Sequence, residues 1–430
     1  MKKIYTLFGA LLITAACSTD LDQAPTNIAS ADSLSDFEGV LNAAYWYQTG
    51  STTPLAIMGD FRSDNALFDE SPHDEFDDFD GGVVSMEGDF FRPFYSSLYK
   101  SILSANSVID NSDDATQVAE AKFLRALSYS KLVKVFGGVT LNLSPSPSTT
   151  DQSILARSSA ADVYLQIETD LADAISVLDN TGLSTGRATR IAAQALLGKV
   201  HLAQGDASSA ESVLASVVNG ASAAGISLLD NFSAVFASDL NAEIIFATQL
   251  SSSIGISDYS GDTFNVWYAG GNTKADEIPV SMELINAYTD GDTRKSVTVD
   301  AAIQVSNKYQ TLGADQDWIE IRFADVLLMY AEALNEGGNT AGAATQLNKV
   351  RNRAGLSNTT ASSQAALREA IQHERRLELA FEGHHWFDLV RTGTVDAEMG
   401  QSINSNYYIF PIPTSEIFAS DEVITQNPGY

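Results

Sequence analysis

Residues 373–391, with the sequence HERRLELAFEGHHWFDLVR, place many charged side chains among aromatic and aliphatic ones. Leu377 and Phe381 lie about one helical turn apart, so they give a helix one apolar face. The Glu and Arg residues around them are spaced to pair with each other or with neighbouring helices. Gly383 then ends the helix, and Trp386 begins a second apolar surface. The pattern predicts a stretch that locks helices together, rather than an active site.

The histidines of this stretch make a metal site the alternative interpretation. His384 and His385 are adjacent, so on a helix their side chains point about 100° apart. His373 does not complete the His-Glu-x-x-His spacing that places two ligands on one helical face. Because the chain has a single cysteine, a cysteine metal cage is also excluded. We therefore expect no metal and no cofactor.

Helical periodicity dominates the rest of the chain. Val163, Ile167 and Leu171 recur at steps of four, which lays one apolar stripe along a predicted helix at 161–178. Two predicted helix pairs, at about 189–218 and 323–353, have close to the ~34-residue length of a tetratricopeptide unit. The sequence predicts a mostly α protein, with a tetratricopeptide-like scaffold of helical pairs, long irregular loops and a few short strands.

Shorter signals complete this outline. Ser208 and Glu211 have the spacing of a capping box, which predicts a helix start. Short strands are predicted at 243–250 and 407–413. Three segments, 49–92, 137–158 and 251–280, show no helical or strand periodicity and are predicted to be loops. Loops of this length inside a compact domain are usually functional.

The first residues have the features of an export signal. Lys2 and Lys3 supply a positive start, and a short apolar run leads to small residues and then Cys17. This junction resembles the lipobox of bacterial lipoproteins, although Thr14 stands where Leu is common. We predict a signal peptide at 1–16, then a lipidated Cys17 with its tether at 17–30. The alternative is an ordinary signal peptide followed by an incidental cysteine.

Several segments of the C-terminal half resemble the signature of the SusD/RagB family. The resemblance extends upstream through most of the chain after the tether, in the order expected for the family. The segments that carry it are RFADVLLMYAEALNE at 322–336, LNKVRNRAGL at 347–356, LREAIQHERRLELAFEGHHWFDLVRTG at 367–393, IFPIPTSEI at 409–417 and QNPGY at 426–430.

The resemblance implies a nutrient-binding domain over 31–430, with an N-terminal part at about 31–220 and a C-terminal signature part at about 240–430. It also implies ligand loops on one face of the scaffold. The implied partner is a SusC-like, TonB-dependent porin in the outer membrane, on which the lipid-anchored protein sits at the cell surface. The implied ligand is most often an oligosaccharide and sometimes a peptide.

The loop at 58–82 combines residues suited to sugar recognition. Charged and amide groups exchange hydrogen bonds with hydroxyls, and aromatic rings cover the apolar face of a sugar ring. A solvated acidic surface is the alternative, and no calcium loop of the EF-hand type fits its aspartates. The candidate ligand residues here are Arg62, Asp64, Asn65 and Phe68.

A second candidate loop, at 257–277, carries aromatic residues without helical or strand periodicity. Aromatic residues of this kind beside glycines are typical of an exposed stacking platform, although they also pack loops down. Tyr259, Phe264, Trp267 and Tyr268 are the candidates. Core packing is favoured instead for Trp46, Tyr47 and Trp318.

Charge and motif content narrow the function. With 25 Lys and Arg against 55 Asp and Glu, the chain has a formal charge of -30, which disfavours binding to nucleic acid. No nucleophile elbow, phosphate loop or zinc-protease motif is present. We therefore expect a glycan-binding protein rather than an enzyme, with a peptide-binding uptake protein as the alternative and a helical glycoside hydrolase as a third hypothesis.

Overall fold

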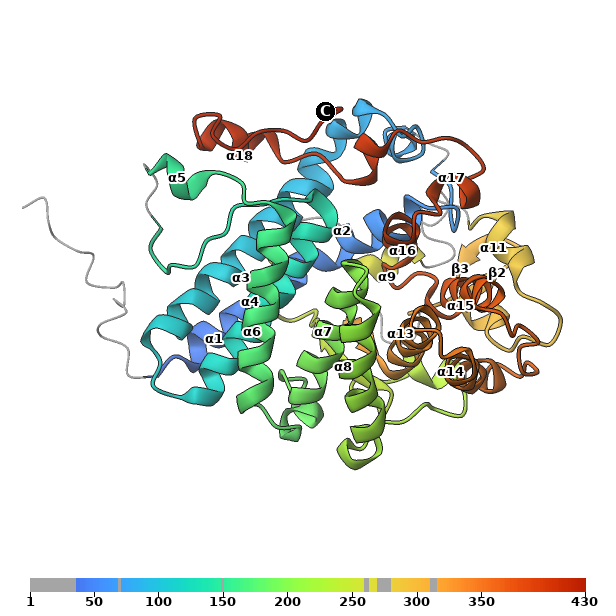
Figure 1. The fold of residues 1–430 in the computed structure, drawn as a ribbon. Helices are drawn as coiled ribbons and strands as arrows, with labels where there is room; N and C mark the ends of the chain where they lie inside the picture. Colours follow the sequence, from blue (N-terminus) through green and yellow to red (C-terminus); the bar gives the residue numbers. More distant parts are fainter. Residues whose placement is uncertain (1–35, 69–70, 148–150, 259–262, 269–279, 310–314) are drawn as a thin grey trace, which may run out of the picture.

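The computed structural model describes residues 36–430 apart from 69–70, 148–150, 259–262, 269–279 and 310–314. The described chain is mostly helical with a few short strands (Figure 1), which confirms the predicted fold class. The predicted signal peptide, Cys17 and the whole predicted tether lie outside the described residues.

The scaffold consists of ten longer helices of the described chain, named here with their bounds: α1 (Glu38–Tyr47), α3 (Arg92–Asn111), α4 (Ala115–Phe136), α6 (Ala160–Val177), α7 (Arg190–Ala203), α8 (Ala207–Gly220), α13 (Phe323–Glu336), α14 (Thr340–Arg353), α15 (Gln364–Leu379) and α16 (His385–Thr392). From α3 to α8 each helix packs on the next, and α13 then packs on α8. Figure 1 shows this row of helices. The predicted pairs correspond to α7 with α8 and α13 with α14.

Side-chain caps fix where these helices begin. The side chain of Ser159 accepts a hydrogen bond from the backbone N–H of Asp162, at the start of α6. At α8 the cap is Asp206, which accepts from the N–H of Ser209. The predicted capping box at Ser208 is therefore wrong by two residues, because an aspartate at the preceding turn already satisfies the free N–H groups.

The strands form two small antiparallel sheets. β1 (Ile244–Thr248) pairs with β4 (Trp318–Arg322), and β2 (Val299–Asp300) pairs with β3 (Val305–Ser306). β1 confirms the strand predicted at 243–250. The strand predicted at 407–413 is wrong: Ser405–Tyr408 form a 3-10 turn. Pro411 and Pro413 lack the N–H groups that a sheet ladder needs.

The segments predicted as irregular loops contain short helical turns. Residues 49–92 hold α2 (Thr52–Ala56) and two π-helical turns, Ile57–Phe61 and Glu87–Phe91. The remaining short helices are α5 (Gln152–Leu155), α9 (Phe264–Tyr268), α11 (Met282–Ala287), α12 (Lys295–Thr298), α17 (Val395–Glu398) and α18 (Thr414–Ala419).

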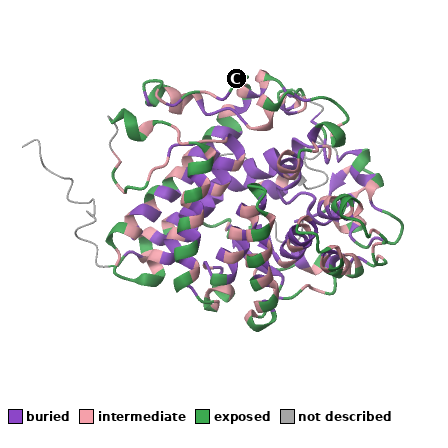
Figure 2. Cartoon of the chain, viewed as in Figure 1, coloured by how far each residue is buried: buried purple, intermediate pink, exposed green. Residues whose placement is uncertain are grey.

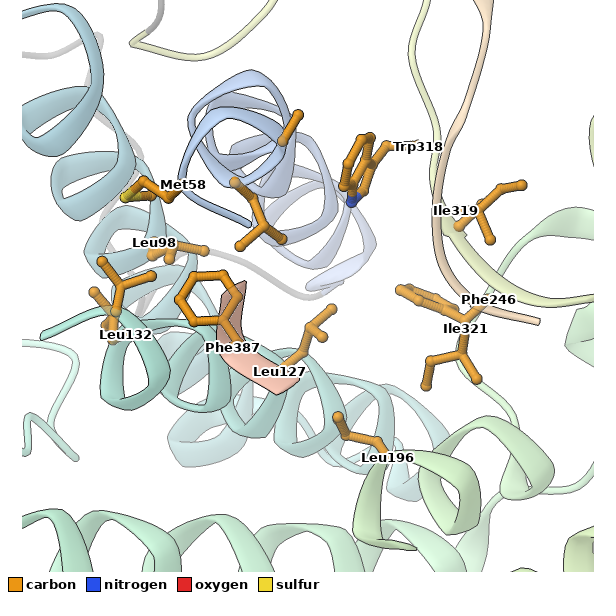
Figure 3. Close-up of a cluster of buried hydrophobic side chains, with 14 of the residues drawn as sticks. Met58, Leu98, Leu127, Leu132, Leu196, Phe246, Trp318, Ile319, Ile321 and Phe387 are labelled. Atoms are coloured by element: carbon orange, nitrogen blue, oxygen red, sulfur yellow. The ribbon is translucent and has the colours of Figure 1, made fainter. Parts of the chain in front are cut away.

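The hydrophobic core runs along the helix row and under the small sheet, as the buried residues in Figure 2 show. Figure 3 shows part of it, with Leu98 of α3, Leu132 of α4, Trp318 of β4 and Phe387 of α16. Each fully buried side chain of this size stabilises the fold by about 1.5–3 kcal/mol. The full burial of Trp318 confirms its predicted place in the core.

Arg322 of β4 is the centre of a buried ion network. Its guanidinium pairs with Glu378 at 2.6 Å, Glu382 at 2.7 Å and Glu243 at 2.9 Å. Although burial opposes ionisation, Arg353 and Arg322 hold the pKa of Glu378 well below its usual range. The network balances five carboxylates against five cations: Glu243, Asp292, Glu374, Glu378 and Glu382 against Arg294, Lys308, Arg322, Arg351 and Arg353.

A second set of ion pairs holds α16 against α13 and α15. Arg375 pairs with Asp325 at 2.8 Å and with Asp388 at 3.0 Å. Arg391 pairs with Asp388 at 2.8 Å and with Glu332 at 2.5 Å. Together with the full burial of Trp386, these contacts confirm that residues 373–391 lock helices together.

A glycine contact docks the 58–82 loop onto this stretch. A side chain at Gly59 would place its Cβ 2.5 Å from the carbonyl carbon of Gly383. Gly383 itself has a φ of 75°, in the left-handed region that favours glycine. The N–H of Gly383 donates a hydrogen bond to Asp60. The two backbones therefore meet at a distance that only two glycines permit.

Candidate ligand-binding face

The two loops predicted to carry the ligand site meet in the structure. The imidazole of His73, from the first loop, lies edge-on to the indole of Trp267, with ring centroids 5.4 Å apart. Phe68 lies 5.7 Å from His73, and Phe90 lies 5.7 Å from Trp267. We call these four residues the aromatic cluster. It joins segments that are almost 200 positions apart in the chain.

Trp267 of the aromatic cluster and the nearby Phe264 are both buried. The exposed platform expected from the sequence is therefore wrong for these two residues. Trp267 is 3% exposed and Phe264 is 0% exposed. The ring of Phe264 packs edge-on against Tyr309 at 5.0 Å and Trp318 at 4.9 Å. The physical reason is that partners from distant segments surround these rings. Whether they contact a ligand stays a prediction.

Two further candidates fall outside what the structure describes. Tyr259 lies outside the described residues, and Tyr268 ends α9 with only its backbone described. Their predicted role as ligand contacts therefore stays a prediction.

Arg62 is fully buried and ties the 58–82 loop to the C-terminal segment. Its guanidinium donates to the carbonyl of Phe76 at 2.9 Å and to that of Tyr407 at 3.2 Å. The guanidinium carbon also lies 4.6 Å from the ring centroid of Phe79 and 5.4 Å from that of Trp386. Burial lowers the pKa of Arg62 to about 10, so the group remains a cation at neutral pH.

Asp64 and Asn65 are also engaged within the protein. Asp64 pairs with Arg376 and with His385, at 2.7 Å in each case. Although burial opposes it, the hydrogen bond from His385 and the charges of His385 and Arg376 lower the pKa of Asp64. The side chain of Asn65 donates to Asp60 at 3.1 Å and accepts from Arg376 at 3.0 Å. These polar groups anchor the loop to the stretch at 373–391.

The aromatic pair Trp46–Tyr47, at the end of α1, is only half-buried, and its predicted core packing is therefore wrong. The two rings lie 5.1 Å apart with an interplanar angle of 49°. The indole N–H of Trp46 donates to the carbonyl of Gly255 at 3.2 Å. This contact brings the segment 251–258 against the end of α1 and leaves ring surface exposed.

The neighbourhood of Trp46 and Tyr47 also supplies polar groups. The ammonium of Lys100 pairs with Asp258 at 2.6 Å, and both side chains are partly exposed. The N–H of Ser257 donates to the hydroxyl of Thr49 at 3.0 Å. We call Trp46, Tyr47, Lys100 and the segment 251–258 the α1 face. Sequence periodicity missed it because the aromatic pair continues the apolar pattern of α1 to its last turn.

A polar cleft of about 330 Å³ lies between α15 and α16. Gln372, His373, Thr392 and Glu398 are among the side chains that line it. It supplies hydrogen-bonding groups for the hydroxyls of a sugar, but its lining contains no ring of Phe, Tyr or Trp for the C–H face. It therefore suits a sugar less well than the α1 face does.

The histidines of residues 373–391 lie in different surroundings. His385 bonds to Asp64, whereas burial, followed by the charge of Lys199, lowers the pKa of His384 to about 3. Within the described ranges, no three His, Cys, Asp or Glu side chains are grouped in a way that would hold a metal ion. Among the described helices, none combines the length and the apolar character that crossing a bilayer requires.

Two family models match most of the chain between them. Residues 259–407 match the SusD family model, and residues 18–202 match a model described as starch-binding associating with outer membrane. SusD-like protein P2 of Formosa agariphila is 25% identical to this chain over 512 aligned residues, which cover 100% of both chains. A SusD-like protein of Bacteroides ovatus is 24% identical and covers 90% of this chain and 82% of its own.

Solved structures share the fold. A laminarin binding SusD-like protein superposes with a TM-score of 0.73 at 29% identity, covering 92% of this chain and 99% of its own. Surface glycan-binding protein A from Bacteroides fluxus superposes with a TM-score of 0.74 at 22% identity, covering 92% of this chain and 99% of its own. The chain therefore belongs to the SusD/RagB family.

Proposed function

We propose that this protein is a lipid-anchored glycan-binding protein of the cell surface, which captures an oligosaccharide and delivers it to a SusC-like, TonB-dependent transporter of the outer membrane. The observation that carries the proposal is the likeness, over nearly the whole chain, to a SusD-like protein described as laminarin binding. The family model described as starch-binding supports the same ligand class.

The α1 face has the chemistry for a neutral sugar. The exposed surface of Trp46 and Tyr47 offers apolar ring faces for the C–H side of a sugar. The Lys100–Asp258 pair and the backbone of 251–258 offer donors and acceptors for hydroxyls. The net charge of -30 favours a neutral glycan over an acidic one.

The direct test is a binding screen by affinity electrophoresis and calorimetry, with laminarin, starch, xylan and mannan. We expect saturable binding to at least one neutral glycan. Trp46→Ala should weaken that binding at least about tenfold, as the loss of a central aromatic contact does, and Tyr47→Ala should weaken it less. Phe418→Ala, which removes an aromatic side chain that is 68% exposed on α18, is the matched control and should bind like the wild type.

Other outcomes identify the alternatives. A folded protein that binds a peptide library and no glycan would establish peptide capture. Accumulation of shorter sugars from a polysaccharide would establish a hydrolase.

The transporter partner and the lipid anchor have separate tests. For delivery, we expect the membrane-bound protein to co-purify with a TonB-dependent porin. We also expect Cys17→Ala to release the protein from the outer membrane, since acyl chains supply the anchor.

A further inference from the structure

A cleft of about 250 Å³ opens between α4, α6, α7 and α16, away from the α1 face. At ~30 Å³ per water molecule, it has room for about eight waters. Most of its lining is apolar, and the apolar side chains come from each of these elements. They include Val133, Tyr164, Leu196, Val200, Phe387 and Val390.

Lys134 of α4 brings a positive charge into this apolar lining. Its ammonium lies 4.5 Å from the ring centroid of Phe387. No carboxylate of the described residues forms an ion pair with Lys134. A cation in such surroundings is costly unless it is paired, so the cleft holds a charge that lacks its counterpart.

The other cations that line the cleft have carboxylate partners. Arg375 and Arg391 share Asp388 and also pair with Asp325 and Glu332 respectively. Lys199 pairs with Asp325 at 3.3 Å. Four cations therefore face three carboxylates, and the surplus of one positive charge is that of Lys134.

We propose that this cleft binds a small amphiphilic carboxylate, with the carboxylate between Lys134 and Lys199 and an aliphatic or aromatic body against Val133, Leu196 and Phe387. A sugar is a poor fit because its many hydroxyls need partners, whereas the polar groups here are mostly engaged with each other. One surplus cation matches one carboxylate, and the apolar lining matches an apolar body. The site goes beyond the proposed glycan-binding function.

Binding at this cleft has a defined pH dependence. Burial, followed by the charge of Lys199, lowers the pKa of Lys134 to about 7. The other titratable groups around it are Lys131, which is paired with Glu320, Asp388, whose pKa Arg375 and Arg391 hold well below its usual range, and His384, whose pKa burial lowers to about 3. The carboxylate needs a protonated Lys134. Affinity should therefore rise about tenfold as the pH falls from 8 to 6.

Hexanoate is a suitable probe, with hexanamide and hexylamine as neutral and cationic controls. By calorimetry at pH 6, we expect hexanoate to bind with a Kd of about 1 mM or tighter, and both controls to bind at least about tenfold more weakly. Equal binding of hexanoate and hexanamide, or no hexanoate binding in a folded sample, would overturn the proposal.

Lys134→Met keeps the length of the side chain and removes its charge. We expect it to weaken hexanoate binding about tenfold or more and to abolish the pH dependence. Because the substitution removes an unpaired charge from an apolar site, the variant should fold and melt at or above the wild-type temperature. The matched control is Lys122→Met on the same helix, where Lys122 pairs with Asp173 of α6. It should leave hexanoate binding unchanged, and wild-type affinity in Lys134→Met would refute the assignment.

A spectroscopic readout reports on Lys134 without relying on a variant's stability. With ¹³C-methylated lysines, NMR titration should show a lysine signal with a pKa near 7. This signal should be absent in Lys134→Met, and its pKa should rise when hexanoate is added. Glycan binding should be the same in wild type and Lys134→Met. The two proposals therefore fail separately: loss of glycan binding tests the α1 face, and loss of hexanoate binding tests this cleft.

Discussion

The ion network around Arg322 and the aromatic cluster around Trp267 are both buried, but they hold the molecule together by opposite means. In the network, every guanidinium nitrogen of Arg322 donates to a particular oxygen, and the acceptors belong to Glu243, Glu378 and Glu382. In the aromatic cluster, rings contact each other with their centroids 5.4–5.7 Å apart, and such contacts tolerate small rearrangements. Charges therefore specify which elements meet, whereas rings fill the space between them.

The difference also appears in what removal leaves behind. Loss of a ring leaves a void that neighbouring rings partly fill. Loss of one charge leaves buried partners without a counterion, which is more costly than the pair was worth. The network should thus fail sharply and the cluster gradually.

The largest effect should come from Arg322→Met. This change leaves Glu378 and Glu382 with fewer cations in a site closed to water. We expect the free energy of unfolding to fall by about 3–5 kcal/mol, as measured by urea titration with tryptophan fluorescence. Arg368→Met is the matched control, because it breaks the more exposed pair with Glu336 and should cost at most about 1 kcal/mol. Equal losses in the two variants would contradict the special role of the network.

A smaller loss is expected from Phe264→Ala. The ring is fully buried against Tyr309 and Trp318, so its removal should lower the free energy of unfolding by about 3 kcal/mol. The same urea titration measures this loss, and Phe418→Ala on the exposed face of α18 serves as the control. If Phe264→Ala abolishes glycan binding while the free energy of unfolding stays at the wild-type value, then Phe264 contacts the ligand and does not serve mainly to stabilise the core.

The periodic part of the fold was predictable, and the burial of the aperiodic loops was not. Helices such as α6 and α7 have an apolar stripe that is local in sequence, so their presence and approximate position follow from the spacing of apolar residues. Trp267, by contrast, is buried by contacts with His73 and Phe90, which lie far away in the chain. No local pattern encodes such a contact. Absence of periodicity indicated the absence of a long helix, but it did not indicate exposure to solvent.

The candidate site illustrates the same limit. Arg62, Asp64 and Asn65 were predicted as sugar contacts because of their chemistry, and that chemistry is used within the protein, toward Tyr407, His385 and Arg376. Trp46 is predicted in the core, and it is half-buried instead. Composition identifies residues able to bind, whereas only the fold shows which of them still have a free surface.

A pH titration separates paired from unpaired carboxylates. The folded-state pKa of Glu378 is lowered, so its contribution to stability is present above pH ~4.3 and is lost as the pH falls below that value. Asp77 behaves in the opposite way. Burial raises its pKa to about 7, so its folded state favours the proton and stability is lost as the pH rises from about 4 to 7.

Asp77→Asn should therefore stabilise the protein at pH 8, by at most about 1–2 kcal/mol, and leave it nearly unchanged at pH 4. Asparagine keeps an acceptor for the N–H of Phe68, which donates to Asp77 at 2.7 Å. Thermal melting at both pH values measures the effect. The same stabilisation at pH 4 and pH 8 would show that the effect has another origin.

The smallest change in stability should come from Lys100→Met, which removes the exposed pair with Asp258 on the α1 face. Water already screens this pair, so the free energy of unfolding should change by less than about 1 kcal/mol, in contrast to Arg322→Met. Its effect on binding should be larger than its effect on folding, because the pair holds the segment 251–258 beside Trp46. We expect glycan affinity by calorimetry to fall by about threefold to tenfold, with Lys122→Met as the control. Unchanged affinity would mean that the hydrogen bond from Trp46 to Gly255 suffices to position the segment, and that rings alone make up the α1 face.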